Sequence, residues 1–153
     1  MAKIDNPRKK YNFSVAIAPL PINPFLFQKV TIPEKTIEQI VHGDVNYDVK
    51  TGGRSTFGNI MLEKLMLTDG ADNYFWDWAS AVCDNVIGGG LVPSQYKRVL
   101  IITELAEDGT SILNTWVCTG CWPTKINGQE LDRVSSENSM ESIELSVDIV
   151  EKV

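Results

Sequence analysis

The feature of this sequence that most constrains its fold is the alternation of apolar and polar residues, which is typical of β-strands that bury one face. Near the C-terminus the aliphatic positions are Ile143, Leu145, Val147 and Ile149, and the polar ones are Ser142, Glu144, Ser146 and Asp148. Residues 37–49 alternate in the same way. Both segments are predicted to be strands, and further strand candidates are residues 11–18, 25–32, 60–67, 97–105 and 111–118.

One segment, residues 71–86, breaks this alternation. Its apolar residues Phe75, Trp78, Ala79, Val82 and Val86 recur at helical spacing. Asp69 and Asp72 suit the start of a helix, and Gly88-Gly89-Gly90 suits its end. Asp108-Gly109 and Asn127-Gly128 predict tight hairpin turns. The expected fold is therefore mainly β, a small antiparallel β-barrel or sandwich with one α-helix packed on it.

The distribution of charge divides the chain into two parts. Its 153 residues suit one domain with a single hydrophobic core, and its net charge is −6. The first ten residues carry four basic side chains and one acidic, so the remainder carries 10 basic and 19 acidic ones. We expect residues 1–10 to form a basic N-terminal arm and residues 11–153 a single β domain. The domain of residues 11–153 is so acidic that it would repel the phosphate backbone of DNA, and specific DNA binding is therefore not expected.

No motif predicts catalysis, a cofactor or a metal ion. Cys118-Thr119-Gly120-Cys121 has the spacing of a zinc or redox motif, but structural zinc needs four ligands and the chain adds only Cys83 and His42. The motif also lacks the helix N-terminus that activates redox cysteines. The cysteines are expected to be buried apolar residues or to form a disulfide. His42 falls among polar residues and is expected on the surface.

Two further features bear on where the protein works. The apolar residues 15–27 are interrupted by three prolines, so no membrane span is expected there, and no secretory signal is apparent. We therefore expect the chain to be made and folded in a cytoplasm. A small ligand-binding β-barrel and a redox or metal protein built on Cys118 and Cys121 are rival functions.

A series of short motifs extends along residues 11–152. It comprises residues 13–17, 27–30, 38–43, Phe57-Gly58-Asn59-Ile60-Met61-Leu62-Glu63-Lys64, Trp76-Asp77-Trp78, Trp116, Trp122-Pro123-Thr124-Lys125-Ile126-Asn127-Gly128, Leu131-Asp132 and residues 139–145. In their order and spacing these motifs resemble the contractile-tail tube protein family, which includes phage tail tubes and the Hcp-like tubes of type VI secretion. The motifs do not separate a phage tail from a bacteriocin or a secretion machine.

The resemblance implies a structural protein and not an enzyme. Strands of neighbouring subunits would join in a hexameric ring, and rings would stack into a tube for DNA delivery. The implied partners are further copies of the chain, a tail sheath protein, baseplate and tail terminator proteins, and DNA that passes without specific binding. No membrane is implied. The protein would be assembled in the host cytoplasm and reside in the tail of the virion.

Four sets of residues are candidates for contacts in such a tube. The Gly-rich segment 50–59 is longer than a hairpin needs, which indicates an interface. With the basic arm, the inter-ring candidates are Lys50, Gly52, Gly53, Arg54, Phe57, Arg8, Lys9 and Lys10. The polar positions Glu38, His42, Asp44 and Asp48 are expected to face an acidic channel, and Asp77 and Asp84 a basic sheath. Cys83, Cys118 and Cys121 are candidates for a disulfide within or between subunits.

Overall fold

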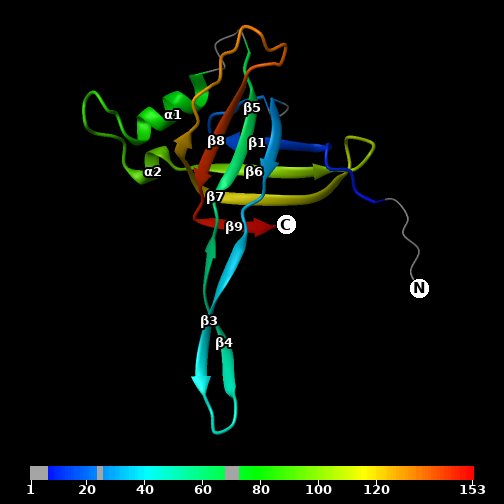
Figure 1. The fold of residues 1–153 in the computed structure, drawn as a ribbon, viewed down its shortest axis with the longest axis vertical. Helices are drawn as coiled ribbons and strands as arrows, with labels where there is room; N and C mark the ends of the chain where they lie inside the picture. Colours follow the sequence, from blue (N-terminus) through cyan, green and yellow to red (C-terminus); the bar gives the residue numbers. More distant parts are fainter. Residues whose placement is uncertain (1–6, 24–25, 68–72) are drawn as a thin grey trace.

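The computed structural model describes residues 7–23, 26–67 and 73–153, which form a mainly β protein with two short helices (Figure 1). The strands are β1 (Phe13–Ala18), β2 (Phe27–Thr31), β3 (Lys35–Gly43), β4 (Asp48–Phe57), β5 (Ile60–Leu65), β6 (Arg98–Leu105), β7 (Ile112–Ile126), β8 (Met140–Ser146) and β9 (Ile149–Lys152). The helices are α1 (Tyr74–Val82) and α2 (Pro93–Tyr96). The predicted fold class, mainly antiparallel β with a helix packed on it, is confirmed.

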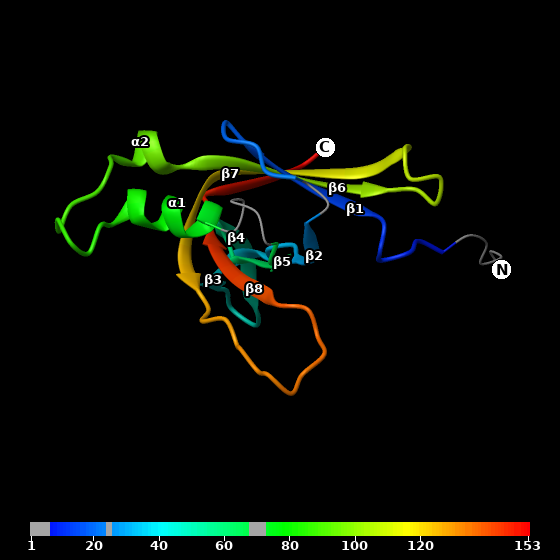
Figure 2. The same ribbon diagram turned by 90° about the horizontal axis from the view of Figure 1, so that it is seen from above.

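The long strand β7 connects two layers. Its first half pairs with β6 and β9, and its second half pairs with β8. Between the halves, Gly120 has a φ of +74°, a conformation that suits glycine and a bend. Figure 2 shows β1, β6 and β9 along the first half of β7, with β8 and β5 in a second layer. In the described part of the chain the strand order is β1-β6-β7-β8-β5-β2, so β1 and β2 end the sheet and the barrel is not closed.

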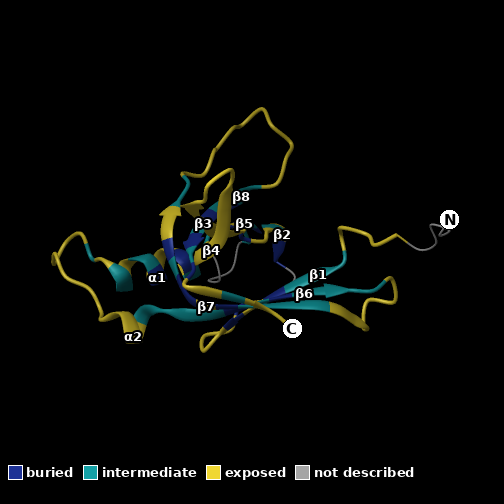
Figure 3. Ribbon diagram, turned by 90° about the horizontal axis from the view of Figure 1, so that it is seen from below, coloured by how far each residue is buried: buried dark blue, intermediate teal, exposed yellow. Residues whose placement is uncertain are grey.

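The hydrophobic core lies between these two layers (Figure 3). In one layer Val15 is opposite Ile102 and Ile17 opposite Leu100; in the other Ile60 is opposite Leu145 and Leu62 opposite Ile143. All eight side chains are almost fully buried, as the period-two pattern requires. On β5, Lys64 is also buried, and its Nζ lies 3.5 Å from the carboxylate of Glu141 on β8.

Helix α1 covers one end of the core. Phe75 and Trp78 are buried, and the Trp78 indole Nε1 donates a hydrogen bond of 2.7 Å to the carbonyl oxygen of Tyr96. The guanidinium of Arg98 lies 4.5 Å from the Trp78 ring centroid and 5.2 Å from that of Tyr74, so it stacks against both rings. These contacts hold the helix to the start of β6.

The helix is shorter than the sequence pattern predicts. Its described part ends at Val82, and Cys83 is already extended. Val86 is exposed and lies outside the apolar stripe. Residues 83–92 form a loop instead, in which Gly88 has a φ of +78°. The expected helix start at Asp69 and Asp72 lies outside the described residues.

Three other strand or turn predictions are wrong. Residues 37–49 are not one strand, because β3 ends at Gly43 and β4 begins at Asp48. The tight turn expected at Asn127-Gly128 is instead the start of a long connection, residues 127–139, whereas Asp108-Gly109 does lie in a hairpin turn. The C-terminal alternation divides into β8 and β9, so Ile149 pairs with β7 and is exposed.

Candidate assembly interface

The hairpin formed by β3 and β4 projects from the body along the longest axis of the molecule (Figure 1). Every residue from Lys35 to Thr56 is exposed, and in the described structure these strands pair only with each other. At the tip, the Asp44 backbone N–H donates to the Tyr47 carbonyl at 2.9 Å, and the Asp44 carboxylate accepts from the Val45 N–H at 2.7 Å. The tip is therefore a closed turn at the end of two strands.

The hairpin carries aliphatic side chains on both of its faces. The register places Ile40 beside Thr51 and His42 beside Val49 on one face, and Val41 beside Lys50 on the other. Ile37, Ile40, Val41 and Val49 are between 40% and 58% exposed. A soluble strand pair normally keeps one face polar, so this hairpin has aliphatic surface that the described residues of its own chain leave uncovered.

The register also corrects the positions of the candidate channel residues. Glu38 and His42 do share one face of β3, because they are separated by an even number of positions. Asp44 lies in the turn, and Asp48 pairs with Gly43, which places Asp48 on the opposite face from His42. The four residues do not share a surface. A turn at residues 44–47 reverses the chain, and single-strand parity cannot be carried through a turn.

The inter-ring candidates at residues 50–59 lie on a strand and not on an irregular loop. Lys50, Gly52, Gly53 and Arg54 belong to β4, where a bulge interrupts the register beside Ile37 and Gln39. A Cβ at Gly53 would lie 3.2 Å from Ile40 side-chain atoms and from the Glu38 carbonyl oxygen, so this strand accepts glycine there most easily. Phe57 lies at the base of the hairpin and packs against the core.

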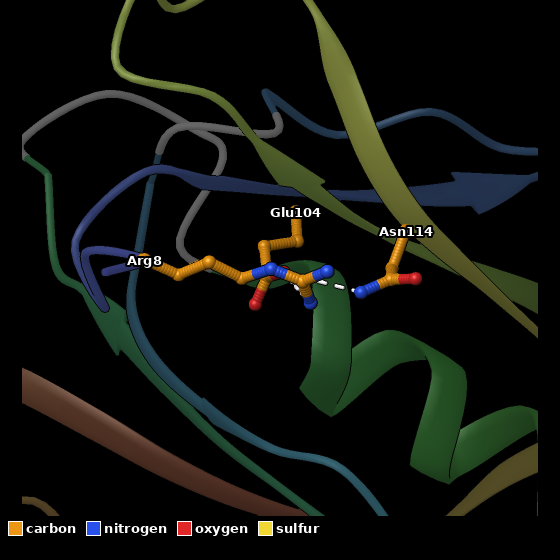
Figure 4. Close-up of polar contacts among 3 residues, drawn as sticks. All are labelled: Arg8, Glu104 and Asn114. Carbon is orange, nitrogen blue, oxygen red and sulfur yellow. Dashed lines mark hydrogen bonds and ion pairs between the residues drawn. The ribbon is translucent and has the colours of Figure 1, made fainter. Parts of the chain in front are cut away.

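The described part of the basic arm, residues 7–10, contacts the outer end of the β6–β7 hairpin through Arg8. Arg8 Nη1 lies 3.0 Å from the carboxylate of Glu104, which also accepts a hydrogen bond of 3.3 Å from the Asn114 side-chain amide (Figure 4). The Asn12 backbone carbonyl accepts from the Leu105 N–H at 2.9 Å. Arg8 is thus engaged within its own chain, while Lys9 and Lys10 are exposed.

A groove of about 660 Å³ lies where β1 and β2 leave the sheet open. The apolar side chains that line it come from both layers, namely Phe13, Val30, Ile32, Ile102 and Trp116. Lys10, Tyr11, Lys29 and Glu104 also line it. Figure 2 shows that β6 and β7 extend past β2, and the groove lies beside this overhang.

The two carboxylates expected to face a sheath have different surroundings. Asp77 is exposed on α1. Asp84 is half-buried, and its carboxylate accepts hydrogen bonds from the Val86 N–H at 2.9 Å and the Ile87 N–H at 3.3 Å. Asp84 therefore shapes the loop after α1. That loop exposes Val86 and Ile87.

All three cysteines are free thiols in this structure. Cys118 and Cys121 are fully buried on β7, whereas Cys83 is exposed. Burial raises the pKa of Cys118 to about 11, and burial together with the neighbouring Cys118 raises that of Cys121 to about 12. Two neutral, enclosed thiols are not nucleophiles. A bridge between subunits could use only Cys83 without unfolding β7.

A metal site and a membrane-spanning helix are both absent from the described residues. Among the residues that the structure describes, no group of three or more His, Cys, Asp or Glu side chains is arranged to hold a metal ion. Within the same ranges, no helix is long and apolar enough to cross a membrane.

Sequence reasoning missed the apolar hairpin tip, Val45 and Tyr47, as a candidate contact. Alternation through residues 37–49 places Val45 and Tyr47 on the apolar side of one long strand. The available signal was Gly43-Asp44 followed by Asn46, a cluster of turn-forming residues within the alternation.

Residues 9–151 match the family model of the T4-like virus tail tube protein gp19. The chain is 30% identical over 142 residues to the tail tube protein gp19 of Enterobacteria phage T4, which covers 88% of this chain and 84% of the relative. The same figures hold for gp19 of Enterobacteria phage T6.

Solved structures share the fold at lower sequence identity. The tube-terminating cap of the anti-feeding prophage matches with a TM-score of 0.81 at 21% identity, over 100% of this chain and 95% of the other. A chain of the extended PVC sheath–tube complex, an extracellular contractile injection system, matches with a TM-score of 0.77 at 22% identity, over 98% and 93%. Hcp1 of Flavobacterium johnsoniae matches with a TM-score of 0.54 at 13% identity, over 93% and 94%.

An open, mainly antiparallel β-sheet with a projecting, exposed hairpin defines the fold class of the chain. Within that class, the chain belongs to the T4-like virus tail tube protein family, whose members are components of the tail and not enzymes.

Proposed function

We propose that this protein forms hexameric rings, that these rings stack into the tube of a contractile tail, and that the tube is the channel for DNA delivery. The observation that carries the proposal is the β3–β4 hairpin, whose residues 35–56 are all exposed although both faces carry aliphatic side chains. A two-stranded hairpin of this kind is marginal in water and needs a covering surface. Membership of the tail tube family indicates that this surface belongs to further copies.

The contact between copies would be heterologous. The hairpin and the open edges of β1 and β2 are different surfaces of one chain, and joining them repeats the same contact from copy to copy. Such a contact closes into a ring when its rotation permits, and a second contact of the same type stacks the rings. It also covers the unpaired backbone of the two edge strands, which would otherwise promote aggregation.

The charged candidates are assigned within this assembly as follows. Glu38 and His42, on one face of β3, are proposed to face the channel, where the Glu38 carboxylate of each copy would repel the DNA backbone. Lys50, Arg54, Lys9 and Lys10 are proposed to lie between rings. Asp77 on α1 is proposed to face a basic sheath. A sheath, a tube terminator and a baseplate are the proposed tail partners, as the names of similar assemblies suggest.

The proposal is tested by electron microscopy of the purified full-length protein together with immunogold labelling of phage particles. We expect hollow rings or tubes from the protein, and label along the tail shaft when the tail sheath is removed. Particles without ring symmetry, or label confined to the capsid, would contradict the proposal.

A further inference from the structure

The chain turns back on itself just before β1. Phe13, the first residue of β1, is opposite Glu104 on β6. If β1 continued straight toward the N-terminus, the Arg8 backbone would lie about 16 Å past Glu104, because each strand residue advances the chain by about 3.3 Å, and the two side chains would not meet. Instead the chain turns at residues 10–11, and Figure 2 shows it bending away from the line of β1. Arg8 Nη1 therefore reaches to within 3.0 Å of the Glu104 carboxylate (Figure 4).

Residues 8–12, here called the strap, are attached to the body at their two ends. At the end next to β1, the Asn12 carbonyl accepts a hydrogen bond of 2.9 Å from the Leu105 N–H. The Asn12 side-chain amide donates to the Ala106 carbonyl at 3.2 Å. These two contacts extend the β1–β6 pairing by one residue.

At its other end, the strap is attached by the ion pair between Arg8 and Glu104. Within the part of the chain that the structure describes, this pair is the only hydrogen bond or ion pair from residues 8–11 to the body. Apolar packing adds little, because residues 8–11 are all exposed. A cavity of about 380 Å³ is lined by Arg8 and Lys9 on one side and by Leu105 and Leu113 of the β6–β7 hairpin on the other. The ion pair therefore decides whether this end of the strap is held.

The Arg8–Glu104 pair is of the kind that dissolved salt weakens. The Arg8 side chain is 58% exposed and that of Glu104 is 27% exposed. An ion pair exposed to this degree shifts an equilibrium by about two- to fivefold, and screening by salt removes most of that effect. The Asn114 amide also donates to the Glu104 carboxylate, at 3.3 Å, so the carboxylate keeps a second partner when the arginine leaves. The attached and detached forms of the strap are therefore close in free energy.

We propose that the strap is a conformational switch that ionic strength opens and closes. In the closed form Arg8 is bound to Glu104, and the strap lies against the outer end of the β6–β7 hairpin. In the open form this pair and the Asn12 hydrogen bonds are broken, and the strap extends into solvent with Lys9 and Lys10 free of the body. Low ionic strength favours the closed form, and high ionic strength favours the open form. The switch belongs to a single chain, so it goes beyond the proposed tube and does not depend on it.

The first test is amide hydrogen exchange at Leu105 in the full-length protein, at a concentration where it sediments as a monomer. This N–H is protected by the Asn12 carbonyl only while the strap is closed. Raising the ionic strength from about 0.01 M to 1 M shortens the Debye length from about 30 Å to 3 Å and should speed exchange at Leu105 about two- to fivefold. The Ala106 N–H, which donates to the Ser111 carbonyl within the hairpin at 2.8 Å, is the internal reference and should not respond.

Substitutions at the ion pair show whether this response comes from the strap. Arg8→Gln and Glu104→Gln should each give, at low ionic strength, the fast Leu105 exchange that the wild type shows at high ionic strength. Neither variant should respond further to salt. Arg8→Glu combined with Glu104→Arg should restore both the protection and the salt dependence. Lys9→Gln and Glu107→Gln are the matched controls, because neither residue forms an ion pair among the described residues, and both should behave as the wild type.

Cleavage by a lysine-specific protease gives an independent measurement, because Lys9 and Lys10 become better substrates when the strap leaves the body. The cleavage rate is divided by that of a free peptide of residues 7–14 at the same salt concentration, which corrects for the response of the protease. Wild-type protein should be cut faster at high ionic strength, and Arg8→Gln equally fast at both. A wild-type Leu105 exchange rate that ignores salt, identical exchange in Arg8→Gln and Lys9→Gln, or failure of the exchanged pair to restore protection would overturn the switch and leave the tube proposal standing.

Discussion

Shortening the β3–β4 hairpin should separate assembly from folding. The register pairs Gln39 with Gly52, so the twelve residues between them can be replaced by an Asn-Gly turn that closes the shortened strands. The body should keep its fold, because every removed residue is exposed and none belongs to the hydrophobic core. The bulge and the base of the hairpin, including Phe57, are retained.

Shortening the hairpin should change the free energy of unfolding little and the free energy of association strongly. The free energy of unfolding should change by about 1 kcal/mol or less, equivalent to about 2–4 °C in Tm for a chain of this size. Assembly should lose much more. The removed segment includes Ile40, Val41, Val45, Tyr47 and Val49, all well exposed. Full burial of such a side chain stabilises by about 1.5–3 kcal/mol, so burying half of each in a contact contributes about 4–7 kcal/mol per junction. Its loss weakens association by roughly 10³–10⁵-fold.

Thermal unfolding by circular dichroism and sedimentation velocity over a dilution series measure the two effects on the same samples. The shortened chain should unfold cooperatively near the wild-type Tm and sediment as a monomer. Rings or tubes from the shortened chain would refute the reasoning that the hairpin carries the junction. A loss of more than about 3 kcal/mol in unfolding free energy would refute the reasoning that the hairpin is independent of the core.

Three further predictions concern the body. Trp78→Ala should cost about 3–5 kcal/mol in urea unfolding, whereas Trp78→Phe, which loses the hydrogen bond to Tyr96 and one ring of the indole but keeps most of the packing, should cost about 1–3 kcal/mol; equal costs would contradict the packing role of the ring. Gly120→Ala should cost about 1–2 kcal/mol from its positive φ, and more from the contact of the new methyl group with Asp148, while Gly128→Ala should be nearly neutral. In a thiol assay at pH 8, Cys83 alone should react in the folded protein, and all three cysteines should react in urea. The buried thiols of Cys118 and Cys121 should also make stability depend on pH. Above the ordinary thiol pKa of 9.0 the free energy of unfolding should fall with rising pH, up to about pH 11–12, because only the unfolded thiols ionise in that range.

The period-two pattern predicted the core because it depends on local sequence alone. Val15, Ile17, Leu62, Ile143 and Leu145 all occupy the buried positions that alternation assigns to them. The helix could be predicted for the same reason, since Phe75 and Trp78 lie on its buried face.

The errors arose where the chain changes direction. Alternation continues by chance through residues 44–47, so a hairpin resembled one strand, and its two faces were assigned wrongly. The bend of β7 at Gly120 and the separation of β8 from β9 depend on contacts between distant strands, which local patterns do not contain. The groove between β1 and β2 could not be predicted either, because it lies where β6 and β7 extend past β2 (Figure 2), which depends on contacts between distant strands.

The number of copies in the smallest closed assembly tests the central claim most directly. Native mass spectrometry of the full-length protein, at the lowest concentration that still gives particles by electron microscopy, measures it. The account predicts a species with six times the 17.0 kDa mass of one chain, with larger species only as multiples of that ring. A monomer at every concentration, or a continuous ladder of dimer, trimer and tetramer without a closed form, would contradict it.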